Sequence, residues 1–180
     1  MGQQLMTTDV PSFLAHLPRQ GSLLVPWFVH RDKDGRYQFR VRDVAKHERA
    51  VRFGLCSICG LWSGGPPYFF QVGPLCLEEG VVFGTPVHER CALAALVLCP
   101  FLAQQDWAWG HDRTGATPAG YGTLVPPDEL PPKPSRLGLA LCEDYEPVRA
   151  NGSWYAAFSP PTSIRWWVYR DNVLVPEVAV

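Results

Sequence analysis

The chain has 180 residues, which suits one domain or one domain with an appendage, and 47% of them are apolar, enough to bury a core. A net charge of −1 and a pI near 6.5 exclude a protein that coats nucleic acid or anionic membrane by global positive charge. No secretory signal is visible, and no apolar run approaches the ~20 residues of a membrane span, so we expect a cytoplasmic protein that does not enter the membrane. In a reducing compartment the six cysteines favour metal ligation over disulfides.

The first 42 residues predict a short helix followed by a β-hairpin. Asp9 can cap the helix, and Pro18 ends it. Residues 25–29 have the composition of a strand, whereas residues 37–42 alternate apolar with polar side chains. The intervening Lys33-Asp34-Gly35 is typical of a tight turn, so these two strands are expected to pair.

A basic helix is predicted next, capped by Asp43, running over residues 44–53 and closed by Gly54. Residues 36–52 contain six Lys or Arg against two acids. Side chains three or four residues apart share a helix face, and the basic ones here are Arg42, Lys46, Arg49 and Arg52. We expect this face to contact nucleic acid phosphates or an acidic protein partner. The alternative interpretation is an ordinary solvated helix face.

Two pairs of metal-binding residue types stand at the centre of the sequence. Cys56 and Cys59 form a C-x-x-C motif followed directly by a glycine, and His88 and Cys91 form an H-x-x-C motif. Two close pairs of sulfur and imidazole ligands suit a tetrahedral ion, and four filled positions leave none open for catalysis. The spacing therefore predicts a structural Zn²⁺ held by these four side chains.

The segment between the two pairs predicts the local fold around the ion. Residues 68–72 and 81–83 are expected to form a hairpin. Thr85 can then cap a helix that contains the apolar run 92–98, and Cys99-Pro100 would end this helix. A knuckle, a hairpin and a helix that supplies two ligands together indicate a treble-clef zinc site.

The rest of the chain predicts a connector and a group of strands. Residues 103–135 are rich in glycine and proline and read as an extended connector. Four strands, joined partly by Asn-Gly and Asp-Asn turns, are then expected as an antiparallel meander at residues 137–142, 154–158, 164–169 and 173–175. The predicted fold class is α+β. Four regions are expected to share one compact domain: 1–54, 55–102, 103–135 and 136–180.

The order of these motifs resembles a group of small uncharacterised proteins of bacteria and their phages. The resemblance rests on C-x-x-C-G, then Gly73-Pro-x-Cys76, then His88-x-x-Cys91-Ala, then Cys99-Pro-Phe-Leu, and it covers about residues 25–175. It implies an architecture and a bound zinc ion but no activity.

Two cysteines remain outside the predicted ligand set, and they keep an enzyme or ligand-binding protein open as the alternative function. Cys76 could replace one of the four ligands or act as a reactive thiol near the positive start of the helix predicted over residues 86–98. Cys99, which precedes a proline, could ligate haem. For both, burial as a small apolar side chain is the alternative. His111 in the connector could act as an acid or base. The leading hypothesis is a zinc-stabilised binding module without catalytic residues.

Overall fold

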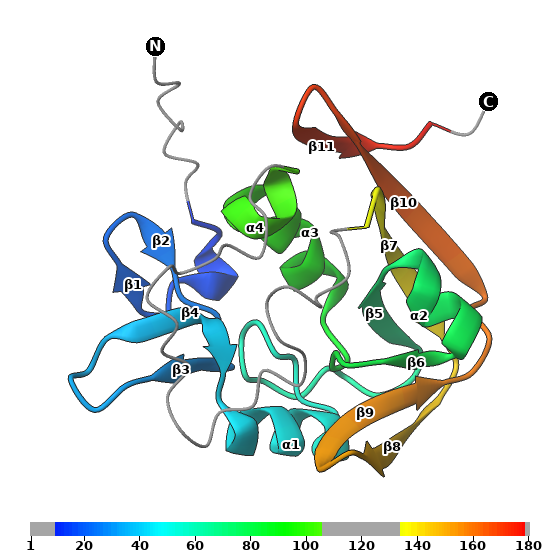
Figure 1. The fold of residues 1–180 in the computed structure, drawn as a ribbon, viewed down its shortest axis with the longest axis horizontal. Helices are drawn as coiled ribbons and strands as arrows, with labels where there is room; N and C mark the ends of the chain where they lie inside the picture. Colours follow the sequence, from blue (N-terminus) through cyan, green and yellow to red (C-terminus); the bar gives the residue numbers. More distant parts are fainter. Residues whose placement is uncertain (1–9, 106–133, 179–180) are drawn as a thin grey trace.

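The computed structural model of the chain (Figure 1) describes residues 10–105 and 134–178. The fold is α+β, as predicted, with small antiparallel sheets and short helices. The helices in the described residues are η1 (Ser12–Leu14, a 3₁₀ turn), α1 (Val44–Phe53), α2 (Pro74–Glu79), α3 (Glu89–Leu98) and α4 (Pro100–Ala103).

The strands of the described residues form four antiparallel sheets. The first six are β1 (Arg19–Gln20), β2 (Leu23–Leu24), β3 (Val29–Arg31), β4 (Tyr37–Arg42), β5 (Tyr68–Val72) and β6 (Val81–Val82). The last five are β7 (Arg136–Cys142), β8 (Tyr145–Ala150), β9 (Ser153–Phe158), β10 (Ser163–Arg170) and β11 (Val173–Pro176). The largest sheet has the order β11-β10-β7-β5, the next has the order β6-β9-β8, and β1–β2 and β3–β4 are separate hairpins.

The N-terminal hairpin forms, but its first strand is displaced. β3 begins only at Val29 and pairs with β4. The residues before it pair elsewhere, because Trp27 N–H donates to the Ile58 carbonyl at 2.8 Å and Phe28 N–H donates to the Ser57 carbonyl at 3.1 Å. The predicted strand over 25–29 thus serves mainly to support the C-x-x-C turn. The predicted helix at the N-terminus is reduced to η1, and its predicted cap, Asp9, lies outside the described residues.

Helix α1 confirms its predicted limits. The Asp43 carboxylate accepts from Lys46 N–H at 3.0 Å, which satisfies one of the free donors of the first turn. Gly54 ends the helix with φ of 66°, a left-handed conformation that costs glycine little. His47, Ala50 and Val51 are the buried residues of this helix.

The hairpin predicted between the two ligand pairs is wrong. β5 pairs with β7, whereas β6 pairs with β9 in the other sheet. The unpredicted helix α2 separates them, since Pro74 occupies its first turn and Gly80 ends it with φ of 65°. The segment therefore keeps the knuckle and the ligand-bearing helix of a treble clef, while its two strands diverge into different sheets.

The ligand-bearing helix α3 starts later than predicted. Val87 N–H donates to the Phe69 carbonyl at 2.9 Å, so this residue continues the edge of β5 instead of entering a helix. His88 is the N-cap, in an extended conformation, and Thr85 does not cap the helix. The Thr85 hydroxyl instead accepts from Ser57 N–H at 3.2 Å. The helix ends at Leu98, before Cys99, as predicted.

The four predicted C-terminal strands are present, but they divide between two sheets. β7, β10 and β11 join β5, and β9 lies between β6 and the unpredicted strand β8. β8 contains Glu146, Pro147 and Arg149, a composition typical of a protected sheet edge, and this hides the alternation that predicts a strand. The turns Asn151-Gly152 and Asp171-Asn172 have positive φ at both central residues, as two-residue hairpin turns require.

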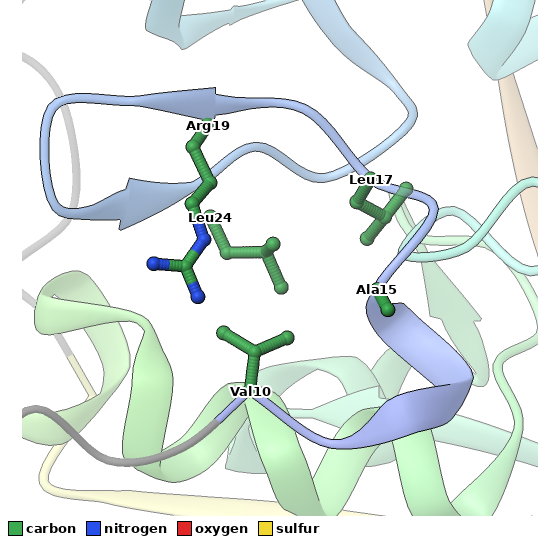
Figure 2. Close-up of a pocket in the computed structure, with 5 residues that line it drawn as sticks. All are labelled: Val10, Ala15, Leu17, Arg19 and Leu24. Atoms are coloured by element: carbon green, nitrogen blue, oxygen red, sulfur yellow. The ribbon is translucent and has the colours of Figure 1, made fainter.

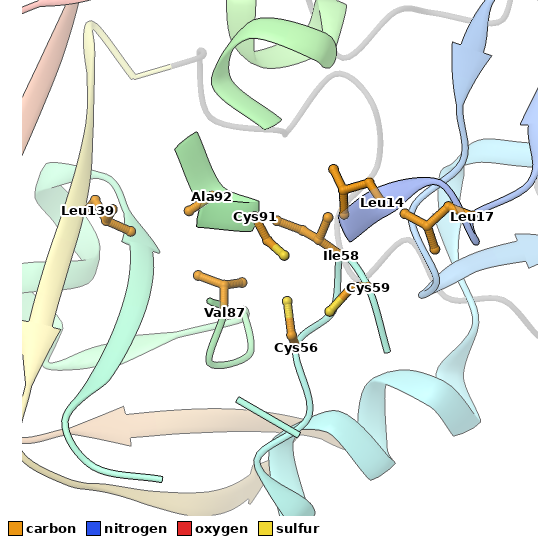
Figure 3. Close-up of a cluster of buried hydrophobic side chains, with 9 residues drawn as sticks. All are labelled: Leu14, Leu17, Cys56, Ile58, Cys59, Val87, Cys91, Ala92 and Leu139. Carbon is orange, nitrogen blue, oxygen red and sulfur yellow. The ribbon is translucent and has the colours of Figure 1, made fainter. Parts of the chain in front are cut away.

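Two buried clusters lie on opposite faces of β5 and β7. The cysteine cluster (Figure 3) consists of Leu14, Leu17, Cys56, Ile58, Cys59, Val87, Cys91, Ala92 and Leu139. The aromatic cluster consists of Phe70, Val72, Val82, Ala140, Cys142, Ala156 and Phe158. Because successive strand residues point to opposite faces, the neighbours Phe69 and Phe70 pack against different clusters.

Within the described residues, every helix is too short or too polar to cross a membrane.

Candidate metal centre

The four predicted ligands converge. One ligand atom from each of Cys56, Cys59, His88 and Cys91 lies within 4.8 Å of the others. The Cys59 sulfur is 3.3 Å from His88 Nδ1, and the Cys91 sulfur is 3.7 Å from the same atom. Figure 3 shows the three sulfur atoms pointing toward one another from the knuckle and from the start of α3. The four side chains can therefore hold a metal ion.

The first pair is positioned by a hydrogen-bonded knuckle. Gly60 N–H donates to the Cys56 carbonyl at 2.8 Å, and Cys56 N–H donates to the Leu61 carbonyl at 2.8 Å. Gly60 has φ of 77°, and a Cβ atom at this position would lie 2.6 Å from the Trp27 ring. Backbone conformation and close packing thus both require the glycine that follows the C-x-x-C motif.

The second pair is positioned by the first turn of α3. His88 is the N-cap and Cys91 lies three residues on, so both side chains point to the same side of the helix start. The N-terminal end of a helix carries positive partial charge, which favours thiolate ligands.

The ring of His88 is fixed by a backbone contact. Its Nε2 lies 2.9 Å from the Trp62 carbonyl, an acceptor only, so Nε2 carries the proton and donates it. The lone pair of Nδ1 is then directed toward the three sulfurs. Such an outer hydrogen bond orients a ligating imidazole and increases its basicity.

The three thiols also influence each other's ionisation. Hydrogen bonding from Cys56 lowers the pKa of Cys59 to about 2, and hydrogen bonding to Cys56 raises the pKa of the Cys91 thiol. Hydrogen bonding with Cys59 raises the pKa of Cys56. The opposite directions of these shifts mean that the three thiols do not ionise independently of one another. A bound divalent ion would stabilise all three as thiolates.

The geometry fits a tetrahedral ion. For metal–sulfur and metal–nitrogen bonds of about 2.3 and 2.05 Å, a regular tetrahedron places sulfur and nitrogen about 3.6 Å apart. The two sulfur–nitrogen distances of 3.3 and 3.7 Å lie close to this value. The sulfur ligands are buried, with Cys56, Cys59 and Cys91 at most 5% exposed. A buried site with four protein ligands is typical of a structural metal.

The other two cysteines singled out by the sequence are not part of this group. Cys76 lies on α2 and packs, half-buried, against the aromatic cluster on the far face of β5 and β7. Cys76 therefore does not lie at the start of α3, as the interpretation of it as a reactive thiol required, and its packing agrees with the alternative of a small apolar side chain. Cys99 caps the end of α3 and the start of α4 and is half-buried. His111 lies outside the described residues.

The predicted basic face is smaller in the structure, because Arg42 turns inward. Its guanidinium donates to the Phe83 carbonyl and lies 4.5 Å from the centre of the Phe83 ring and 5.7 Å from that of Phe28. Burial lowers the pKa of Arg42 to about 10. The prediction that Arg42 shares an exposed face with the helix is thus wrong, since Arg42 ends β4 and its side chain contacts Phe83, the residue that follows β6.

The three remaining basic residues differ in the hydrogen bonds and ion pairs that their side chains make. Lys46 Nζ donates to the Trp27 carbonyl at 2.8 Å and lies over that indole. Arg52 pairs with Glu48 at 2.8 Å, one turn away. Arg49 is exposed and has no ion pair with any residue in the described ranges.

Three residues around the ligands were not predicted from the sequence. The Trp62 carbonyl holds His88, the Thr85 hydroxyl holds the knuckle at Ser57, and His16 Nε2 contacts the Cys59 carbonyl at 3.1 Å. Each of these three contacts joins a side chain to a backbone atom, and any residue type supplies a backbone atom. The sequence therefore carries no signal for them beyond their closeness to the motifs.

A cavity of about 400 Å³ lies beside the cysteine cluster (Figure 2). Its lining consists of apolar side chains and one guanidinium, from Val10, Ala15, Leu17, Arg19 and Leu24. None of these side chains is a nucleophile or a general acid in the neutral pH range, so the cavity supplies no catalytic group.

Comparisons of the chain with protein-family models, with curated proteins and with solved structures find no match.

Proposed function

We propose that the metal is Zn²⁺ and that its role is structural. Three thiols and one imidazole form a soft, tetrahedral donor set, for which Zn²⁺ is the usual ion in a closed site. The convergence of these four ligand atoms within 4.8 Å, with Nδ1 of His88 directed at the sulfurs, is the observation that supports this most strongly. A reducing compartment such as the cytoplasm would keep the thiols available.

Elemental analysis of the purified protein tests the metal. One Zn²⁺ per chain is expected, and replacement by Co²⁺ should give the intense absorption of thiolate-to-cobalt charge transfer. A stoichiometry near zero in protein purified without chelators, with no uptake of Co²⁺, would contradict the proposal.

We further propose that the zinc-stabilised chain is a binding module that contacts nucleic acid through α1. Arg49 supports this proposal, because it is an exposed cation without an ion pair among the described residues. Arg52 lies one turn further along the same side and is 46% exposed. Lys46 contributes charge at the edge of the face, whereas Arg42 is excluded from it by burial. An acidic protein is the alternative partner of such a face.

Salt-dependent binding of a fluorescent DNA duplex tests this module. Affinity should fall as salt rises, with a shallow slope because few phosphates are contacted. Arg49→Glu should weaken binding at low salt. Arg170→Glu introduces the same charge change at an exposed position on β10 and should leave binding nearly unchanged.

A labelled poly-glutamate peptide separates the two partners. Binding of this peptide, without binding of DNA or RNA at low salt, would contradict the nucleic acid proposal and favour an acidic protein.

A further inference from the structure

Exposed aromatic rings lie next to the basic side of α1. Phe53, at the end of the helix, is 60% exposed, and Trp62, in the turn after the knuckle, is 63% exposed. Trp154 on β9 is half-buried. Large aromatic side chains are usually covered, so two that are mostly open to solvent within ten residues point to a contact surface.

Side-chain contacts connect these rings into one surface. The Arg52 guanidinium lies 5.5 Å from the centre of the Phe53 ring and 5.2 Å from that of Trp154. On the other side, a Cβ atom at Gly54 would lie 3.7 Å from Nε1 of Trp62, so this indole reaches the residue next to Phe53. Figure 1 shows α1 beside the hairpin β8–β9. We call Phe53, Trp62 and Trp154, with Arg52, the aromatic–arginine surface.

The charge around this surface is positive. Arg149 is directly opposite Trp154 in the β8–β9 pair, so both side chains are on the same face of that sheet. Arg49 precedes Arg52 by three residues on α1. Glu48 is the acid that pairs with Arg52, whereas Glu146 is three residues from Arg149 and therefore points to the opposite face of the sheet.

The position of Trp62 is fixed by the metal centre. Its carbonyl accepts from His88 Nε2 at 2.9 Å, and the carbonyl of the preceding Leu61 accepts from Cys56 N–H at 2.8 Å. Two of the four metal ligands thus hold the backbone that presents the indole. An exposed ring on a rigid base loses little conformational entropy on binding.

We propose that the aromatic–arginine surface binds single-stranded nucleic acid, with unpaired bases stacked on Trp62 and Phe53 and phosphates contacted by Arg49 and Arg149. Proteins bind single strands through exposed aromatic rings flanked by positive charge, because every base can stack on an aromatic ring and the phosphates are attracted to the cations. A duplex cannot use these rings because its bases are already stacked and paired. This inference rests on the proposed nucleic acid binding and specifies its substrate.

The experiment compares fluorescence polarisation of a labelled twelve-nucleotide oligothymidylate with that of a duplex of the same length, using the full zinc-loaded chain at low salt. The single strand should bind more tightly. Trp62→Leu removes the π-face but keeps the backbone carbonyl, and it should weaken single-strand binding by at least about fivefold, the lower range for loss of one stacked base. Duplex binding should not change. Leu75→Ala, at a similarly exposed apolar position on α2, should alter neither.

Photocrosslinking with 5-bromodeoxyuridine in the same oligonucleotide adds a direct readout. Crosslinks at Trp62 or Phe53 are expected. Crosslinks confined to other parts of the chain would overturn the inference even if the single strand binds.

Different experimental results would contradict this inference and the proposed function. Equal binding of both oligonucleotides, weakened by Arg49→Glu but not by Trp62→Leu, would overturn the stacking surface and leave nucleic acid binding intact. Absence of binding to either oligonucleotide would overturn both, whether or not poly-glutamate binds. Zinc content and thermal unfolding of Trp62→Leu verify that this variant is folded.

Discussion

The cysteine cluster and the aromatic cluster share two strands but are stabilised in different ways. On one face of β5 and β7, the cysteine cluster brings four ligand atoms within 4.8 Å of one another. On the other face, Phe70 stacks on Phe158 with 5.6 Å between ring centres and meets the edge of Tyr145 at 5.4 Å. The first arrangement can bind a cation, whereas the second consists of apolar side chains that are stabilised by burial.

This difference predicts which perturbation destabilises each face first. Phe69 and Phe70 are adjacent residues of the same type, but their side chains point to opposite faces of β5. Phe69 packs against the cysteine cluster, which contains three of the candidate metal ligands, whereas Phe70 belongs to the aromatic cluster, which contains none of them. Removal of the ion should therefore act first on the cysteine side, and truncation of a ring should act first on the aromatic side.

The largest effect is expected from Cys91→Ala, which removes a ligand from α3. Structural zinc contributes about 10–16 kcal/mol of apparent binding free energy in small zinc domains, as much as the whole stability of about 5–15 kcal/mol of a typical domain. We therefore expect loss of bound zinc and of cooperative unfolding near the wild-type temperature. Calorimetry and elemental analysis of the same sample measure both.

Cys142→Ala is the matched control, because Cys142 is fully buried but lies in the aromatic cluster. It should cost only about 1–2 kcal/mol and keep one zinc per chain. Equal stability of Cys91→Ala and Cys142→Ala, both with full zinc, would show that the ion does not distinguish the two faces.

Phe70→Ala should give the next largest effect. Truncation of a fully buried phenylalanine typically costs about 3–5 kcal/mol, because apolar contacts are lost and a cavity remains. The folded fraction should still bind one zinc with unchanged affinity. Phe69→Ala should destabilise less, since Phe69 is only half-buried, but it should lower zinc affinity because it supports the cysteine cluster. Denaturant unfolding and competition with a chromogenic chelator measure these two quantities.

Two glycine substitutions compare the two faces again, with a smaller expected loss of stability. Gly60→Ala would place Cβ 2.6 Å from the Trp27 ring in a left-handed conformation, so both strain and displacement of the indole are expected, at about 2–3 kcal/mol, with weaker zinc binding. Gly138→Ala would place Cβ 3.0 Å from side-chain atoms of Trp166 and Val72, which can move by a few tenths of an ångström. It should cost about 1 kcal/mol and leave zinc binding unchanged. Chelator competition and thermal unfolding separate the two variants.

The sequence predicts the metal ligands better than it predicts the strands around them. Ligand identity follows from two motifs whose spacing is local, C-x-x-C and H-x-x-C, and both motifs fold into the turns that their residues favour. Pairing of β5 with β7 joins residues about 70 positions apart, so nothing in the residues next to β5 indicates its partner. The predicted hairpin instead paired residues 68–72 with the next strand along the chain, residues 81–83.

The sequence also does not predict which of the basic residues are exposed. The spacing of Arg42, Lys46 and Arg49 is correct for a helix face, but Arg42 precedes the helix and is drawn inward by the rings of Phe28 and Phe83. That contact depends on how β6 approaches α1, a tertiary arrangement that local periodicity does not contain. Trp62 illustrates the same limit, since its contact with His88 is made by its backbone carbonyl.

The effect expected to be smallest at neutral pH concerns His47, which is buried on α1 against the ring of Phe83, with 4.6 Å between ring centres. Burial, together with the charge of Arg42, lowers the pKa of His47 to about 4 from its ordinary value of 6.5. The stabilising contribution of neutral His47 is therefore complete above pH 6.5. It declines as pH falls toward 4, because the unfolded chain binds a proton that the folded chain does not, for a loss on the order of 2 kcal/mol.

His47→Gln should remove this part of the pH dependence. Acid also protonates the metal ligands, but that effect is common to both proteins, so the difference between wild type and His47→Gln between pH 7 and pH 5 isolates His47. In the aromatic cluster, by contrast, burial raises the pKa of Cys142 to about 11 and that of the adjoining Tyr145 to about 12, so both groups stay neutral over this range. Denaturant unfolding of zinc-loaded protein at the two pH values measures the difference, and the same pH dependence in both proteins would mean that folding does not shift the pKa of His47.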